Sequence, residues 1–131
     1  MVINFKYKDK SYKINNSLSI ATIADLDENR KIIFIDRRVP KKFREGVAVH
    51  EIEKRNFMKK GNTHTYSHNE ARKRSLAFYM GKLDGGQKAF KFLEEEEKCL
   101  LNILEKQCNE GKRNLNPFVD DKIIKFVSPR K

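Results

Sequence analysis

Apolar and polar residues alternate at the start of the chain. The alternation covers Ile3 to Tyr7 and resumes at Tyr12 and Ile14, beyond the polar, turn-like residues 9–11. A period of two residues is typical of a strand with one buried and one solvated face. The pattern therefore predicts a β-hairpin at the beginning of the chain.

A second pair of strands is predicted over residues 18–24 and 31–36, separated by polar turn residues at 27–29. The later strand contains the run from Ile32 to Ile35, in which every residue is apolar. Such a run is typical of a strand that is covered on both faces. Together the two pairs predict an N-terminal antiparallel sheet of three to four strands.

The pattern becomes helical at Pro40. Proline is favoured at the first helical position, where its missing N–H leaves no hydrogen bond unmade, and this helix is expected to end near Lys59. A second helix is expected to end at Leu83, and it has two candidate N-caps, Thr63 and Ser67. The sequence leaves both starts open.

The third predicted helix spans residues 87–109 and carries an apolar stripe along one side. The stripe consists of Phe90, Leu93, Leu100 and Leu104. It suits either the core or a homodimer interface. Residues 118–127 then predict a last strand or an extended tail, and residues 1–131 are expected to form a single α+β domain.

The chain is strongly basic, with 29 Lys and Arg against 18 Asp and Glu and a formal net charge of +11. Residues 37–82 carry most of the excess. A surface of this charge either attracts a polyanion such as DNA or RNA through its phosphates or is simply a solvated face. The candidate phosphate contacts are Arg37, Arg38, Lys41, Lys42, Lys59, Lys60, Arg72, Lys73 and Arg74. One hypothesis is therefore a non-enzymatic protein that binds nucleic acid non-specifically or acts in assembly.

The sequence predicts an intracellular, cytoplasmic protein without a membrane partner. Its longest run of aliphatic and aromatic residues has four members, against about 20 needed to span a bilayer, and its polar start lacks a signal peptide's apolar region. Cys99 and Cys108 fall about 13 Å apart along the third predicted helix, beyond the reach of a disulfide. The Lys-, Ile- and Asn-rich composition resembles that of small proteins of viruses of hyperthermophilic archaea, which implies the host cytoplasm.

The histidines His50, His64 and His68 fall within 19 residues on two consecutive predicted helices. His50 precedes Glu51 on a helix that directly follows the predicted apolar strand. This layout resembles the zincin metallopeptidases, whose helix begins the HExxH motif with a histidine ligand and a glutamate that activates the metal-bound water. The resemblance covers roughly residues 31–70. It implies a zinc ion, with Glu51 as general base.

The motif departs from the zincin pattern at Lys54, because a protonated lysine cannot ligate zinc in place of the second histidine. Glu53 offers a carboxylate on the same side of the helix as His50. An antiparallel return of the second helix would bring His68 toward them. The candidate metal ligands are therefore His50, Glu53 and His68, with water in the fourth position.

These residues predict a zincin-like metal-binding domain. They leave open whether it is a metal-dependent hydrolase that acts on a peptide or other amide bond, or a degenerate, inactive relative. If Thr63 is the cap of the second helix, His64 and His68 stand four residues apart and form a second candidate ligand pair.

Overall fold

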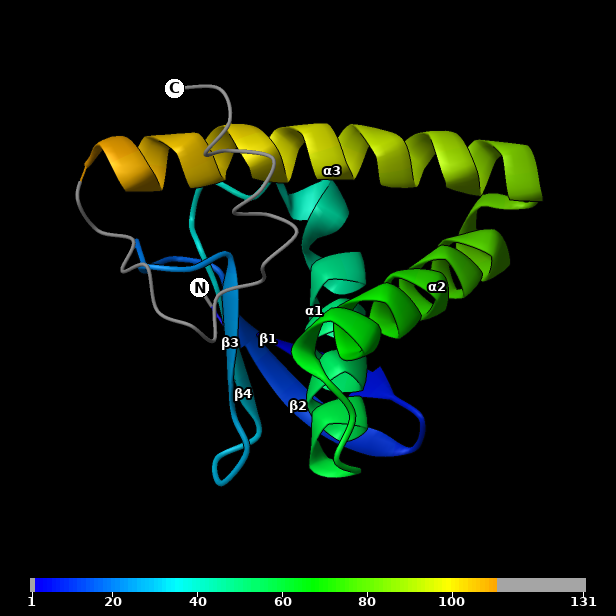
Figure 1. Ribbon diagram of the computed structural model, residues 1–131, viewed down its shortest axis with the longest axis horizontal. Coiled ribbons are helices and arrows are strands. Elements are labelled where there is room, and N and C mark those ends of the chain that lie inside the picture. Colours follow the sequence, from blue (N-terminus) through cyan, green and yellow to red (C-terminus); the bar gives the residue numbers. More distant parts are fainter. Residues whose placement is uncertain (1, 111–131) are drawn as a thin grey trace.

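A computed structural model describes residues 2–110 and shows a four-stranded sheet followed by three helices (Figure 1). The elements are β1 (Val2–Tyr7), β2 (Lys10–Asn15), β3 (Ala24–Asp27), β4 (Ile32–Ile35), α1 (Lys41–Lys59), α2 (His64–Leu83) and α3 (Gly86–Asn109). The expected α+β class is confirmed. The predicted last strand or extended tail, at residues 118–127, lies outside the described residues. Within residues 2–110, no helix is long and apolar enough to cross a membrane.

The sheet has the strand order β1-β2-β4-β3 and differs from the expected antiparallel sheet at its centre. β1 pairs with β2, and β3 with β4, in antiparallel orientation. β2 and β4 lie parallel, with Lys13 opposite Ile32 and Asn15 opposite Phe34. A parallel pair needs a crossover connection. Residues 16–23 begin this crossover by carrying the chain to the far edge of the sheet, where β3 forms.

The prediction of a strand at residues 18–24 is wrong, because β3 begins only at Ala24, the last residue of this range. Leu18 is 49 % exposed, so its apolar side chain does not alternate into the core as the prediction required. Backbone hydrogen bonds from the amides of residues 36 and 37, together with side chains, hold the segment without making it a strand. The Asp36 carboxylate accepts a hydrogen bond from the Ile20 amide, and the Gln107 amide donates one to the Ile20 carbonyl.

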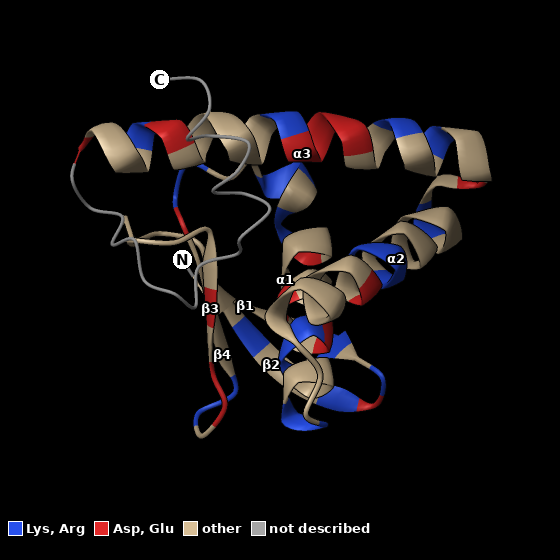
Figure 2. Ribbon diagram, viewed as in Figure 1, with Lys and Arg blue, Asp and Glu red and all other residues tan. Residues whose placement is uncertain are grey.

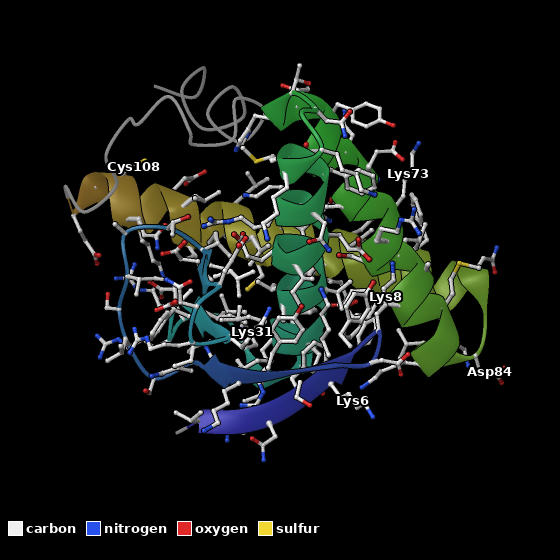
Figure 3. The ribbon with its side chains drawn as sticks, turned by 90° about the horizontal axis from the view of Figure 1, so that it is seen from below. Lys6, Lys8, Lys31, Lys73, Asp84 and Cys108 are labelled. Atoms are coloured by element: carbon white, nitrogen blue, oxygen red, sulfur yellow. The ribbon has the colours of Figure 1, made fainter. Side chains whose placement is uncertain are left out.

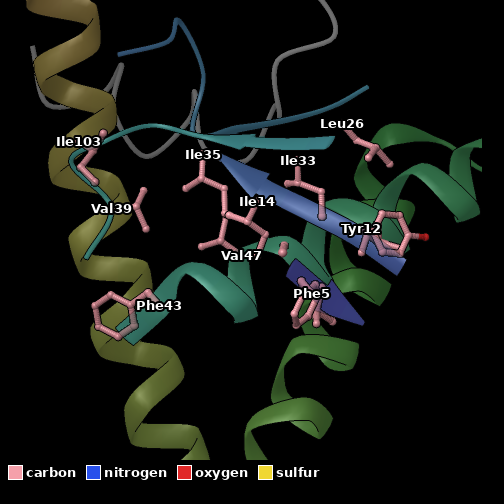
Figure 4. Packing of buried hydrophobic residues seen from close by; sticks show 13 residues of the cluster. Phe5, Tyr12, Ile14, Leu26, Ile33, Ile35, Val39, Phe43, Val47 and Ile103 are labelled. Carbon is pink, nitrogen blue, oxygen red and sulfur yellow. The ribbon is translucent and has the colours of Figure 1, made fainter. Parts of the chain in front are cut away.

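One face of the sheet packs against α1 and forms the main core (Figure 4). Ile14, Ile33 and Ile35 are completely buried, but the alternate residues of β4 are only partly buried, so this strand is fully covered on one face and not on both faces as its apolar run predicted. Val47 and Val49 of α1 are buried as well, although they lie on different sides of the helix. α1 is therefore enclosed by the sheet and by the other two helices.

α3 lies across one end of the molecule, beside the start of α1 (Figure 1). Leu93 and Leu104 of the apolar stripe are buried within the chain, whereas Phe90 is 47 % exposed. Much of the stripe thus serves the core of this chain. A homodimer through residues 87–109 stays a prediction.

The three helices meet at a buried contact between Gly46, Tyr79 and Glu96. A Cβ at Gly46 would lie 1.9 Å from the Tyr79 hydroxyl, so glycine is what lets α1 and α2 approach here. Tyr79 donates a hydrogen bond of 2.7 Å to Glu96, whose side chain is almost fully buried. Burial raises the pKa of Glu96 to about 8, although this hydrogen bond acts in the opposite direction. At neutral pH this carboxyl is therefore mostly protonated.

Candidate metal site

The antiparallel return of α2 brings His68 to His50. The Nε2 atom of His50 lies 3.1 Å from the Nδ1 atom of His68, and the two ring centroids are 4.7 Å apart. Figure 3 shows α1 and α2 lying next to each other. This arrangement brings together two side chains that are 18 residues apart in the sequence. The sequence spacing anticipated this pair, because a tight turn joins two helices of sufficient length.

The turn between the helices is set by local chemistry. Gly61 has a φ of +91°, a left-handed conformation that glycine adopts without steric strain. Thr63 is the N-cap of α2, and its hydroxyl accepts a hydrogen bond from the Tyr66 amide. Ser67, the other candidate cap, lies within the first turn of the helix. Its side chain is buried, and its hydroxyl donates a hydrogen bond to the Thr63 carbonyl. With this start, His64 occupies the first helical position, one turn before His68.

Glu53 is held by residues of the β1–β2 hairpin. The Tyr7 hydroxyl donates a hydrogen bond of 2.6 Å to its Oε2 atom, and the Lys8 ammonium lies 2.7 Å from the same oxygen. Burial by itself would raise the pKa of Glu53, but the hydrogen bonds from Lys8 and Tyr7 outweigh it and leave that pKa below its usual value. Glu53 is thus an ionised carboxylate that ties the hairpin to α1.

Glu51, the candidate general base, is held by two cations of its own helix. Its Oε2 atom lies 3.0 Å from Nε of Arg55, and its Oε1 atom lies 3.5 Å from the Lys54 ammonium. Arg55 also contacts Asp25 on the edge strand β3, at 2.6 Å. These contacts hold the buried Glu51 carboxylate in an ion-pair network between α1 and the sheet edge, in which Asp25 is exposed.

The structure therefore brings together two of the three proposed metal ligands. Among residues 2–110, no group of three or more His, Cys, Asp or Glu side chains is arranged to hold a metal ion. The contacts of Glu53 with Tyr7 and Lys8 join residues more than 40 positions apart. No periodicity or motif in the sequence signals such contacts.

The two ring nitrogens form a hydrogen bond whose donor depends on the tautomers, and their separation also fits a shared metal ion. Zinc binds imidazole nitrogen at about 2.0–2.1 Å, so two such ligands at a tetrahedral angle are about 3.3 Å apart. The observed 3.1 Å is close to this value. The pair has the ligand chemistry that zinc, copper and nickel prefer, and it leaves further coordination positions for water.

Four of the nine candidate phosphate contacts are engaged in ion pairs within the chain. Arg38 pairs with Glu110, Lys59 with Glu28, Arg72 with Glu97, and Lys73 with Glu70. The others, Arg37, Lys41, Lys42, Lys60 and Arg74, make no ion pair with an acidic residue in the described part of the chain. Figure 2 shows basic residues on several elements, interspersed with acidic ones. Net charge alone thus overstates the positive surface that is available to a ligand.

Comparison of the chain with protein-family models, with curated proteins and with solved structures gives no match.

Proposed function

We propose that the protein binds a divalent transition-metal ion, with zinc as the first candidate, through His50 and His68. The observation that carries the proposal is the 3.1 Å separation between His50 Nε2 and His68 Nδ1. Both nitrogens come from helices that pack along their length, so the backbone holds the two rings together before any ion arrives. Such preorganisation favours binding because little conformational freedom is lost.

The proposal is for metal binding rather than for hydrolysis. A zincin-type reaction needs a carboxylate that takes a proton from the metal-bound water. Glu51 is neutralised by Arg55 and Lys54, and Glu53 by Lys8, so both carboxylates already have strong partners. With two histidines and water as ligands, the site suits reversible binding of the ion.

Calorimetric titration with zinc tests the proposal. The parent for every variant is Cys99→Ser/Cys108→Ser, because thiolates also bind zinc and would obscure the histidine site. The parent should bind close to one zinc per chain. Both His50→Ala and His68→Ala should remove this binding, because a single imidazole holds zinc only weakly.

His64→Ala is the matched control, since it removes an imidazole from the same helix one turn away from His68. This variant should keep the parent's zinc affinity. Circular dichroism on each variant confirms that the fold is retained. Failure of the parent to bind zinc, copper or nickel would overturn the proposal, and so would unchanged affinity in His50→Ala and His68→Ala.

Acidic solution should weaken the binding reversibly. A protonated imidazole has no lone pair for the metal, so protons and the ion compete for the same nitrogens. Each titration is therefore repeated at several pH values. A zinc affinity that stays constant from neutral to acid pH would exclude histidine as the ligand.

A further inference from the structure

A strip of aromatic and basic side chains lies where the end of α1 meets the start of α2. It consists of Phe57, Lys60, Tyr66 and Arg74, and is called the aromatic–basic strip below. The Phe57 ring is at its centre. The Lys60 ammonium lies 5.6 Å from the centroid of this ring, and the Arg74 guanidinium carbon lies 5.8 Å from it. Two positive charges thus lie over one aromatic ring.

Tyr66 supplies an accessible aromatic surface beside these charges. Its side chain is 48 % exposed, and its ring lies nearly perpendicular to that of Phe57, at a centroid distance of 6.1 Å and an interplanar angle of 86°. The T-shaped contact with Phe57 holds the orientation of the Tyr66 ring. A ring that is both held and exposed is a stacking surface for another planar group.

The charges of the strip are available to a ligand. Neither Lys60 nor Arg74 forms an ion pair in the part of the chain that the structure describes, whereas their neighbours Lys59 and Lys73 do. Arg74 lowers the pKa of Glu53 through space, but the hydrogen bonds to that carboxylate come from Tyr7 and Lys8. The guanidinium of Arg74 therefore keeps its hydrogen-bond donors for an incoming anion.

We propose that the aromatic–basic strip binds single-stranded nucleic acid, with phosphates contacting Lys60 and Arg74 and one base stacking on Tyr66. The exposed Tyr66 ring favours single strands over duplexes, because the faces of bases in a duplex are already covered by the neighbouring bases. The net charge of +11 adds a long-range attraction that helps such a ligand to arrive. The contacts imply no sequence preference, since every base has a face that can stack.

Fluorescence anisotropy with labelled oligothymidylate of about 15 nucleotides, at about 0.05 M salt, tests this proposal. Tyr66→Ala should weaken binding about tenfold or more, whereas Tyr66→Phe, which keeps the ring, should stay within about twofold of the parent. Duplex DNA of equal length should bind more weakly than the single strand, and Tyr66→Ala should leave its affinity nearly unchanged.

A charge-matched control separates the strip from general attraction. Lys60→Ala/Arg74→Ala and Lys88→Ala/Lys91→Ala remove the same charge, but Lys88 and Lys91 are exposed on α3, beyond the opposite end of α2. The first double variant should lose most of the affinity and reduce the slope of log affinity against log salt by about 1.4, which corresponds to two phosphates. The second should change both only slightly.

Two outcomes would overturn the proposal. One is an absence of oligothymidylate binding by the parent protein. The other is an equal loss in the two double variants together with an unchanged affinity in Tyr66→Ala, which would show attraction by net charge alone. Because the strip contains no metal ligand, these results are independent of the zinc titration.

Discussion

Replacing Glu96 by glutamine should change how the stability of the protein depends on pH. Glu96 is 4 % exposed and accepts a hydrogen bond from Tyr79 at the junction of the three helices. Burial is the main cause that raises its pKa from 4.5 to about 8, and the neighbouring Glu97 carboxylate adds to this rise. Glutamine has nearly the same shape, still accepts the Tyr79 hydrogen bond through its carbonyl, and carries no charge at any pH.

The sign of the effect follows from proton binding. The folded protein keeps the Glu96 proton up to about pH 8, whereas the unfolded chain releases it near pH 4.5. Unfolding therefore releases a proton between these values, so rising pH favours the unfolded state. The free energy of unfolding should fall by about 1.4 kcal/mol per pH unit in this window, or about 3 kcal/mol between about pH 5.5 and pH 7.5. The Glu96→Gln variant lacks this contribution.

Urea unfolding of both proteins across this pH range provides the assay. Other titrating groups are shared by the two proteins, so the difference between their unfolding free energies isolates Glu96. Relative to the parent, Glu96→Gln should become more stable by about 3 kcal/mol as the pH rises from about 5.5 to 7.5. A difference that stays constant over this range would show that Glu96 is not buried in its neutral form.

Two further substitutions test the packing and capping of α2. Gly46→Ala should destabilise the protein by about 1–3 kcal/mol, because the Cβ of the alanine would overlap the Tyr79 hydroxyl. A melting temperature equal to the parent's would contradict the close approach of α1 and α2. Thr63→Ala should lower the free energy of unfolding by about 1 kcal/mol, because the Tyr66 amide loses its acceptor; urea unfolding would show no change if α2 began at Ser67 instead.

Helix boundaries were predictable because their signals are local. Pro40 marks the start of α1, although it is the N-cap residue and not the first helical residue as expected, and Gly61 breaks the helical pattern between α1 and α2. The choice between Thr63 and Ser67 as the cap was not predictable, since both carry a suitable hydroxyl and the surrounding contacts decide. The central parallel pair of the sheet escaped prediction for a similar reason: strand order depends on contacts between distant segments.

The candidate site, too, was predictable only where local signals determine it. The meeting of His50 and His68 follows from two helices joined by a short turn, and the sequence contains both elements. The engagement of Glu53 depends on Tyr7, 46 residues away, and no local pattern reports on it. Ion pairing of basic residues is equally non-local, as in the contact between Arg38 and Glu110.

The binding of zinc by His50 and His68 can be observed atom by atom in the nitrogen NMR spectrum of the histidine rings, recorded during zinc titration. Each ring nitrogen gives its own resonance, so the measurement identifies which atom binds the ion. We expect His50 to be metallated at Nε2 and His68 at Nδ1, with both shifts saturating together and His64 unaffected. Metallation of His64, binding at the other nitrogen of either ring, or spectra unchanged by zinc would contradict this expectation.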